Sequence, residues 1–256
     1  MSLFLLAALI LFCFMTLVFL LALKLEDNSI VDVAYGLGFV LVGWSIFVAN
    51  GSAEARQLLL LTLVTLWGLR LAAHIGSRKL KEKGEDPRYA QWRESWGKTF
   101  VWRSFLQIFM LQGAVIYLVS LPLLLVMRNA GGPLSWLDLS GVLIWLFGFA
   151  YEAIGDWQLK QFKGNPENRG RIMRYGLWRT TRHPNYFGEA TLWWGVFLIA
   201  LGAPFGWLAI ISPLLIDFLL LKVSGIPMLE ERYADNPEFQ EYKKHTNALL
   251  PWFPKT

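Results

Sequence analysis

The chain has 256 residues, of which 55% are hydrophobic and 17% are charged, and its formal net charge is +5. A soluble globular domain is less apolar than this, so a membrane protein is the expected class. The single cysteine, Cys13, excludes a disulfide framework and a cysteine metal cluster within the chain. The three histidines are not paired at metal-ligand spacing, so we predict no metal. No motif supports nucleic-acid binding.

Seven apolar segments are long enough to cross a bilayer, which takes about 20 residues. They lie at about residues 3–23, 29–49, 57–75, 104–127, 139–158, 186–202 and 206–223. They predict an all-α, polytopic membrane protein with a seven-transmembrane-helix bundle, folded as a single membrane domain over residues 1–256. The first segment has no basic start and no cleavage site, so we expect it to be a retained helix and not a signal peptide.

Lysines and arginines gather in three connections between these segments. The residues are Arg78, Lys79, Lys81, Lys83, Arg88, Arg93, Lys98 and Arg103 in the first connection, Lys160, Lys163, Arg169, Arg171, Arg174, Arg179 and Arg182 in the second, and Arg232, Lys243 and Lys244 in the tail. With seven spans, all three connections fall on one side, which the positive-inside rule makes cytoplasmic. We therefore expect the N-terminus outside and the C-terminus in the cytoplasm. Topology or anionic lipid also explains any one of these charges.

Ionisable side chains within the spans are candidates for function because charge is costly at membrane depth. Asp32 and Tyr35 lie three residues apart on the second segment, so they share a helix face. A carboxyl beside a phenol could donate a proton to a carbonyl oxygen, and we take this pair as the catalytic candidate. Alternatively, Asp32 caps or hydrates the start of its helix.

Two further groups of polar residues lie near the ends of spans. Arg70 and His74 share a face of the third segment, where Arg70 could anchor a phosphate or snorkel to the surface. Glu152, Asp156 and Lys160 repeat at four-residue steps on the fifth, with Lys163 a turn later. This stripe could be the wall of a polar cavity or a self-compensated ladder of charges.

The strongest signal is GLWRTTRHPNYFGEATLWWG at residues 176–195, where a basic loop runs into the sixth span. Arg179 and Arg182 offer planar donors for phosphate or carboxylate. His183 and Asn185 add hydrogen-bonding groups at a helix N-terminus, where anions are favoured, and Glu189 follows one turn later. The motif predicts an anion site at the membrane surface, or else a loop that only fixes the return of the chain into the membrane.

The tail MLEERYADNPEFQEYKKHTNALLPWFP alternates aromatic and charged residues and ends in Pro251-Trp252-Phe253-Pro254. We interpret it as an amphipathic cytoplasmic helix that folds back over the bundle. It could dock on the surface or cover a bound cofactor.

Several of these residues carry a family resemblance. Arg182-His183-Pro184-Asn185-Tyr186-x-Gly188-Glu189, Glu230-Glu231 and Tyr242-Lys243-Lys244 resemble the C-terminal domain of the steroid 5-alpha-reductase superfamily. With VDVAYG, RLAAHIGSR and GEDPRY in the first half, the whole chain looks like the bacterial branch of that superfamily labelled a domain of unknown function. Sterol C14-reductases share the C-terminal motif. So do isoprenylcysteine carboxyl methyltransferases and phospholipid methyltransferases, which use S-adenosylmethionine.

The resemblance implies an NADPH-dependent oxidoreductase acting on CH-CH groups in lipid metabolism, multi-pass in the bacterial inner (cytoplasmic) membrane, with its cofactor site facing the cytoplasm. Residues 1–103 would hold the substrate and proton-donor part, and residues 104–256 the cofactor. A hydrophobic enone would come from the lipid bilayer, and no protein partner is required. The implied cofactor contacts, with the Arg70 and Arg182 anion candidates, are Arg70, Arg88, Tyr89, Asp156, Lys160, Lys163, Tyr175, Arg179, Arg182, His183, Asn185 and Glu189.

The chain departs from the steroid enzymes in the second and third helices. Those enzymes carry a glutamate on the second helix and a tyrosine on the third. This chain has Asp32 with Tyr35 on the second helix, and Trp67 or Arg70 on the third. The cofactor expectation is less affected by this departure than the steroid expectation. The alternative function is an S-adenosylmethionine-dependent membrane methyltransferase, and a non-catalytic lipid-binding or assembly factor is a third reading.

Overall fold

The computed structural model describes residues 1–81 and 84–253, and over these residues it is helical without strands. Lys83 and Pro254, used above, lie outside the described residues. The all-helical prediction is confirmed. The chain divides into two compact units: residues 1–134 with 200–209, and residues 135–199 with 210–256. The division predicted at residue 103 falls inside the first unit.

Six helical stretches are long and apolar enough to cross a membrane, which indicates a multi-pass membrane protein. They are Leu3–Leu25, Ile30–Asn50, Ala55–Lys79, Pro87–Val119, Trp136–Gly164 and Gly206–Glu231. The predicted sixth span coincides with α9, Pro184–Ala200, which has only 17 residues and is about 26 Å long at 1.5 Å per residue. The count of seven and the orientation of the termini stay predictions.

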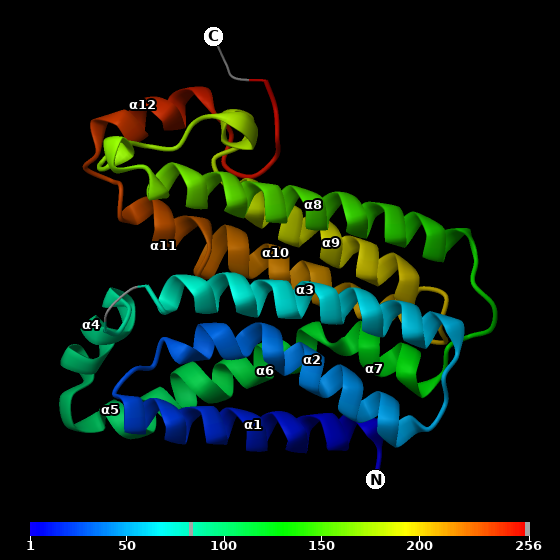
Figure 1. The fold of residues 1–256 in the computed structure, drawn as a ribbon. Helices are drawn as coiled ribbons and strands as arrows, with labels where there is room; N and C mark the ends of the chain where they lie inside the picture. The colour runs from blue at the N-terminus through cyan, green and yellow to red at the C-terminus, as the bar shows by residue number, and fades with distance from the viewer. Residues whose placement is uncertain (82–83, 254–256) are drawn as a thin grey trace. The chain divides into compact units, whose positions relative to one another are not determined.

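Unit 1 contains α1 (Leu3–Leu25), α2 (Ile30–Asn50) and α3 (Ala55–Lys79), followed by α4 (Pro87–Trp96) and α5 (Phe100–Ser104). A π-helical turn, Phe105–Met110, leads into α6 (Leu111–Val119) and α7 (Leu121–Arg128). Helices α2 and α3 lie side by side (Figure 1). They approach closely at two glycines, because a Cβ on Gly36 would lie 2.4 Å from the carbonyl oxygen of Gly68.

The predicted fourth span, 104–127, is a broken helix. It includes the π-helical turn and is interrupted at Ser120, between α6 and α7. Pro122 explains the interruption, because proline has no N–H to bond the carbonyl of Leu118. The sequence pattern showed the apolar length but not these irregularities.

Arg56, at the start of α3, binds the loop carbonyl groups at one end of unit 1. It is 2% exposed and donates to the carbonyl oxygens of Gly202 at 3.1 Å and Pro133 at 2.9 Å, and also to that of Ala130. A guanidinium is suited to this task because its five N–H groups can satisfy several loop carbonyls at once. No role was predicted for Arg56 from the sequence.

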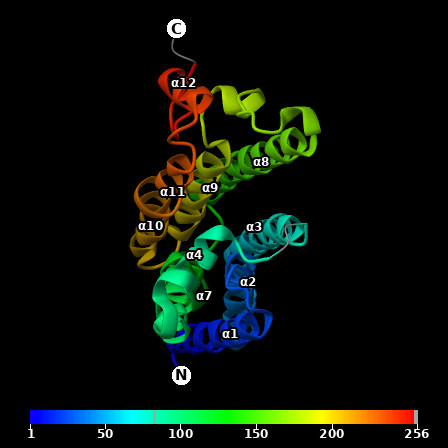
Figure 2. The ribbon, with the colours of Figure 1, turned by 90° about the vertical axis from the view of Figure 1, so that its left-hand side faces the viewer.

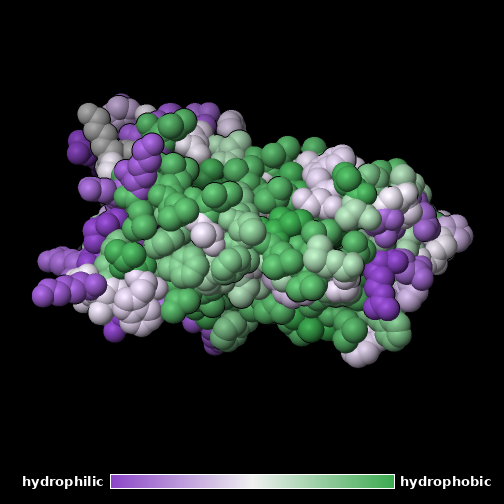
Figure 3. Space-filling view, turned by 90° about the horizontal axis from the view of Figure 1, so that it is seen from below, coloured by the Kyte–Doolittle hydropathy of each residue, from purple (hydrophilic) through white to green (hydrophobic). Residues whose placement is uncertain are grey.

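The face of unit 1 that α1 forms is suited to lipid. Its exposed side chains include Leu5, Leu9, Phe12, Leu17 and Leu20. Figure 3 shows a wide hydrophobic band across the middle of this view, with hydrophilic side chains at its two ends. Such a band is expected where helices cross a bilayer.

Unit 2 contains α8 (Trp136–Gly164), α9 (Pro184–Ala200), α10 (Ile211–Phe218), α11 (Ile226–Glu231) and α12 (Pro237–His245). A π-helical turn, Leu219–Val223, follows α10. The single amphipathic helix predicted for the tail is wrong: the tail forms α11 and α12 with a turn between them. Asn236 caps α12 by accepting from the backbone N–H of Phe239 at 3.0 Å.

Helices α8 and α9 cross almost backbone to backbone. Glycines recur every seven residues on α8, at Gly141, Gly148 and Gly155, and on α9, at Gly188 and Gly195. A Cβ on Gly188 would lie 2.4 Å from the backbone nitrogen of Glu152. Small residues at such spacing let membrane helices pack closely. This crossing fixes the start of α9, and with it the motif at residues 182–189, against α8.

Candidate functional site

A cavity of about 630 Å³ lies in unit 2, next to the end of α8. It is formed by the connection 162–173, the segment before α9, and helices α11 and α12. Figures 1 and 2 both show α12 (red) beside the connection between α8 and α9 (yellow-green). Its volume is in the range of small-molecule and cofactor sites, about 300–1,000 Å³. We refer to it as the basic cavity.

The lining of the basic cavity combines cations with aromatic rings. The cations are Lys163, Arg169, Arg171 and Arg182, and the aromatic residues are Phe162, Trp178, Tyr233, Phe239 and Tyr242, with His183 beside them. Among the residues that the structure describes, no aspartate or glutamate lines this cavity. The lining therefore suits a ligand with flat rings and several negative charges, since guanidinium groups bind phosphate and rings stack on aromatic faces.

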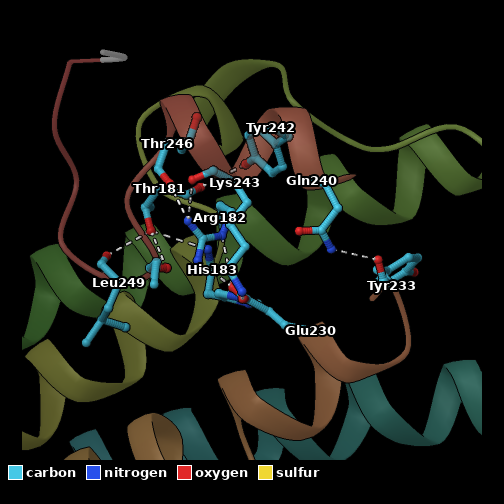
Figure 4. Close-up of polar contacts among 11 residues, drawn as sticks. Thr181, Arg182, His183, Glu230, Tyr233, Gln240, Tyr242, Lys243, Thr246 and Leu249 are labelled. Atoms are coloured by element: carbon cyan, nitrogen blue, oxygen red, sulfur yellow. Dashed lines mark hydrogen bonds and ion pairs between the residues drawn. The ribbon is translucent and has the colours of Figure 1, made fainter. Parts of the chain in front are cut away.

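The wall of the basic cavity depends on one carboxylate, Glu230 of α11. Its Oε1 accepts from Arg182 Nε at 2.9 Å and Nη2 at 2.7 Å, and lies 3.1 Å from His183 Nε2. Its Oε2 lies 2.8 Å from Lys243 Nζ. We call Glu230, Arg182, His183 and Lys243 the Glu230 cluster, and Figure 4 shows its members converging from three segments.

Arg182 is almost fully used within the protein. Its side chain is 7% exposed, and besides its two bonds to Glu230 it donates to the carbonyl oxygens of Lys243, at 3.4 Å, and Thr246. Four of its five N–H groups thus join the start of α9 to α11 and α12. The guanidinium predicted to contact phosphate lines the basic cavity, but it acts mainly to hold the cavity together.

Burial shifts the pKa of two cavity residues. It lowers the pKa of His183, and the charge of Arg182 lowers it further, although Glu230 acts in the opposite direction. His183 is therefore neutral at pH 7 and its ring stacks on Tyr186. Burial also raises the pKa of the Tyr242 hydroxyl, which donates to the carbonyl oxygens of Trp178 and Thr181.

A second polar cluster lies in unit 1, at the first turn of α2. Asp32 Oδ1 accepts from Tyr89 Oη at 2.7 Å, and Asp32 Oδ2 accepts from Arg88 Nη2 at 3.0 Å. Tyr89 is 6% exposed, whereas the side chain of Asp32 is 23% exposed. We call Asp32, Arg88 and Tyr89 the Asp32 cluster; it joins one predicted catalytic residue to two predicted cofactor contacts.

The turn between α1 and α2 positions this cluster. Asn28 donates its backbone N–H to Glu85 Oε1 at 2.8 Å, and Asp27 pairs with Lys79 at 2.5 Å. Burial raises the pKa of Asp27, but the hydrogen bonds from Lys79 and Ser29 lower it more, so the carboxyl stays ionised. These contacts hold the loop before α4 against the start of α2, where Arg88 and Tyr89 reach Asp32.

Tyr35, the predicted partner of Asp32, lies among aromatic rings. Its ring centroid is 5.1 Å from that of Phe39 and 6.3 Å from that of Trp67. No described contact joins it to Asp32, whose phenol partner is Tyr89. The i,i+3 spacing put both residues on one helix face, but it could not show which phenol reaches the carboxylate.

The remaining predicted contacts are spread over both units. In unit 1, Arg70 is half-buried on α3. In unit 2, Lys163, Arg182 and His183 line the basic cavity, whereas Asp156, Lys160, Tyr175, Arg179, Asn185 and Glu189 do not. Asp156 is buried, Tyr175 is 63% exposed, and the buried Oδ1 of Asn185 has no hydrogen-bond donor among the described residues.

Arg169 and Arg171 were not predicted as site residues from the sequence, and no role was predicted for Glu230. Both arginines were visible in the basic connection, and Glu230 was visible in the Glu230-Glu231 pair. Their placement depends on α12 packing against Ile172, through Phe239 and Tyr242. No local pattern predicts this contact.

A family model described as a protein of unknown function, DUF1295, matches residues 18–246. Neither the curated proteins nor the solved structures gave a match.

Proposed function

Since the chain belongs to the DUF1295 family of proteins of unknown function, we propose from its own residues that it is a membrane-embedded NADPH-dependent reductase. The substrate would be a steroid-like or other lipid enone, and the reaction would reduce its conjugated C=C bond. The resemblance to the steroid 5-alpha-reductase superfamily is the source of this reaction class.

The observation that carries the proposal is the lining of the basic cavity. Its four cations, five aromatic rings and lack of a lining acid among the described residues fit a phosphorylated dinucleotide. S-adenosylmethionine fits less well, because it carries two positive groups, a sulfonium and an ammonium, and only one negative group, its own carboxylate. Cations on the wall repel such a ligand and attract one that carries several phosphates.

Different residues would bind the cofactor and supply the proton. Arg169, Arg171 and Lys163 would bind the phosphates, and the Glu230 cluster would hold α11 and α12 in place around them. NADPH supplies the hydride that the β carbon of the enone gains. The Asp32 cluster would supply the proton: the Tyr89 hydroxyl would give its proton to the substrate oxygen, from which it passes to the α carbon, and water would return a proton to Tyr89. The products are the saturated carbonyl compound and NADP⁺.

The test is ligand protection of the purified protein in detergent. A ligand that binds only the folded state raises its stability, by about 2.7 kcal/mol at a concentration of about 100 Kd. We expect NADPH to raise the apparent melting temperature and S-adenosylmethionine to leave it unchanged. Protection by S-adenosylmethionine without NADPH would favour the methyltransferase, and protection by neither would favour a non-catalytic protein.

Variants locate the binding site. Arg169→Gln and Arg171→Gln should each weaken NADPH binding by about 10–100-fold, because a hydrogen bond to a charged group contributes about 1.5–3 kcal/mol. Lys244→Gln is the matched control, since this exposed lysine pairs with Glu241 and does not line the cavity. Arg179→Gln separates the structural assignment from the sequence motif, because Arg179 belongs to the motif but lies outside the lining.

A further inference from the structure

The tail that follows α12 is fixed along the segment before α9. Arg182 donates its backbone N–H to the carbonyl oxygen of Asn247 at 2.9 Å, and Trp252 donates its own to that of Thr180 at 2.9 Å. The Thr181 hydroxyl lies 3.0 Å and 2.8 Å from the carbonyl oxygens of Ala248 and Leu249. The backbone of this tail is therefore held in one place as far as Trp252.

The same tail exposes three large hydrophobic side chains. Leu250 is 67% exposed, Trp252 is 68% exposed and Phe253 is 84% exposed. Three such side chains within four residues, on a backbone held by hydrogen bonds, form an apolar patch that no described residue of unit 2 covers. Apolar area of this kind is unfavourable in water, so the patch calls for an apolar partner.

The residues to which the tail is bonded show where it lies along α8, and so its depth relative to the membrane. Thr180, which binds Trp252, also lies 3.1 Å from the hydroxyl of Tyr151 on α8. One turn further along α8, Ile154 and Trp157 are 45% and 59% exposed within a stretch apolar enough to cross a membrane. The tail patch thus continues the lipid-facing surface of α8 near its polar end.

The charges around the patch agree with a position near the polar end of α8, at the membrane surface. Residues 246–253 contain no acid, while Lys243 and Arg179 lie close by in the chain or in the segment it binds. Tryptophan and phenylalanine beside lysine and arginine are typical of the boundary between headgroups and acyl chains.

We propose that residues 249–253 are an interfacial anchor, which inserts Leu250, Trp252 and Phe253 into the headgroup and acyl-chain boundary of the bilayer that surrounds α8. The partner is a phospholipid surface. Because the anchor binds the carbonyl oxygen of Thr180 and the hydroxyl of Thr181, it holds the start of α9 and the Glu230 cluster at the membrane surface. This role does not depend on which ligand fills the basic cavity.

Site-directed spin labelling tests the anchor. The single native cysteine is removed by Cys13→Ser, and one nitroxide is then placed by Leu250→Cys, Trp252→Cys or Phe253→Cys, so that each variant keeps two of the three side chains. Trp157→Cys on α8 serves as the lipid-exposed reference and Lys244→Cys as the water-exposed reference. The labelled proteins are reconstituted in vesicles of phosphatidylcholine and phosphatidylglycerol, and collisions with oxygen and with a water-soluble nickel chelate are measured.

The three tail positions should behave like position 157, with high access to oxygen and about tenfold less access to nickel than position 244. Nickel access equal to that at position 244 would show a tail in water and would overturn the proposal. Protection from both reagents would show a tail packed on protein, such as a second copy of the chain, and would also overturn it. Melting curves of the three variants check that each one is folded.

Discussion

Tyr89 donates a hydrogen bond of 2.7 Å to Asp32, although 57 residues separate them in the chain. Arg88, the neighbour of Tyr89, bonds the other oxygen of the same carboxylate at 3.0 Å. The first turn of α4 therefore supplies two of the three residues of the Asp32 cluster, and α2 supplies the third. The phenol that donates to Asp32 is thus the one that is distant in the sequence.

This relationship predicts which phenol is needed for turnover. Tyr89→Phe removes only the hydroxyl, so the rate should fall by about 100-fold or more, the usual contribution of a general acid. NADPH protection against heat should be unchanged. The measurement is NADPH oxidation with a steroid enone as substrate, with Asp32→Asn tested in parallel.

Tyr35→Phe is the matched control for Tyr89→Phe. It keeps the ring that packs against Phe39 and Trp67 and removes the same hydroxyl group. We expect a rate close to wild type. A large loss in Tyr35→Phe together with a wild-type rate in Tyr89→Phe would return the role to the pair predicted from the sequence.

A second prediction concerns the carboxylate that holds the wall of the basic cavity. Glu230→Gln leaves Arg182 buried without its counter-charge, and breaking a buried ion pair costs about 3–5 kcal/mol. At about 2–4 °C per kcal/mol, the apparent melting temperature should fall by roughly 6–20 °C. Glu241→Gln makes the same change at an exposed pair with Lys244 and should have no measurable effect. Equal shifts in the two variants would contradict the assigned role of Glu230.

A third prediction concerns pH. Burial lowers the pKa of His183 in the folded state below its ordinary value of about 6.5, so the unfolded chain binds more protons at mildly acidic pH. The contribution of His183 to stability is therefore complete above about pH 6.5 and is lost as the pH falls below that value. Melting temperatures measured from pH 7.5 down to about pH 5.5 should decrease, and they should decrease less in His183→Gln. A stability that rises on acidification would mean that the pairing of His183 with Glu230 outweighs burial.

The sequence predicted the helical class and the multi-pass character, because length and hydropathy are local properties of each segment; the count of seven spans stays a prediction. It predicted the α8 and α9 segments and the motif at 182–189 for the same reason. The contacts that build the two clusters are not local. Asp32 meets Tyr89 only because Asn28 and Asp27 hold the following loop, and Arg182 meets Glu230 only because α11 and α12 fold back beside it.

Local chemistry did not show that Arg182 is buried, and its contact with a cofactor stays a prediction. An exposed arginine beside a helix N-terminus is a good phosphate ligand. In the structure the same guanidinium is buried, and its donors are taken up by Glu230 and by two carbonyl oxygens. Burial is a property of the folded chain, so the exposed Arg169 and Arg171 remain the better candidates for contact with a ligand.

The last prediction concerns the crossing of α8 and α9, which sets the distance between the two sides of the basic cavity. In Gly188→Ala the new Cβ would lie 2.4 Å from the backbone nitrogen of Glu152 and 2.5 Å from the carbonyl oxygen of Gly148. Backbone atoms cannot move aside as a flexible side chain can, so the helices must separate, at a cost of about 1–3 kcal/mol or more. The apparent melting temperature should fall, and affinity for NADPH should fall with it.

Gly164→Ala on α8 makes the same chemical change at the end of that helix. No atom lies within 4 Å of the position of its Cβ, so the added methyl group meets open space. Since alanine is favoured over glycine in a helix by about 0.5–1 kcal/mol, stability should stay the same or rise slightly. A loss of stability in Gly164→Ala as large as that in Gly188→Ala would contradict the assignment of the Gly188→Ala effect to the close approach of the two helices. The difference between the two variants therefore measures the close approach of α8 and α9 directly.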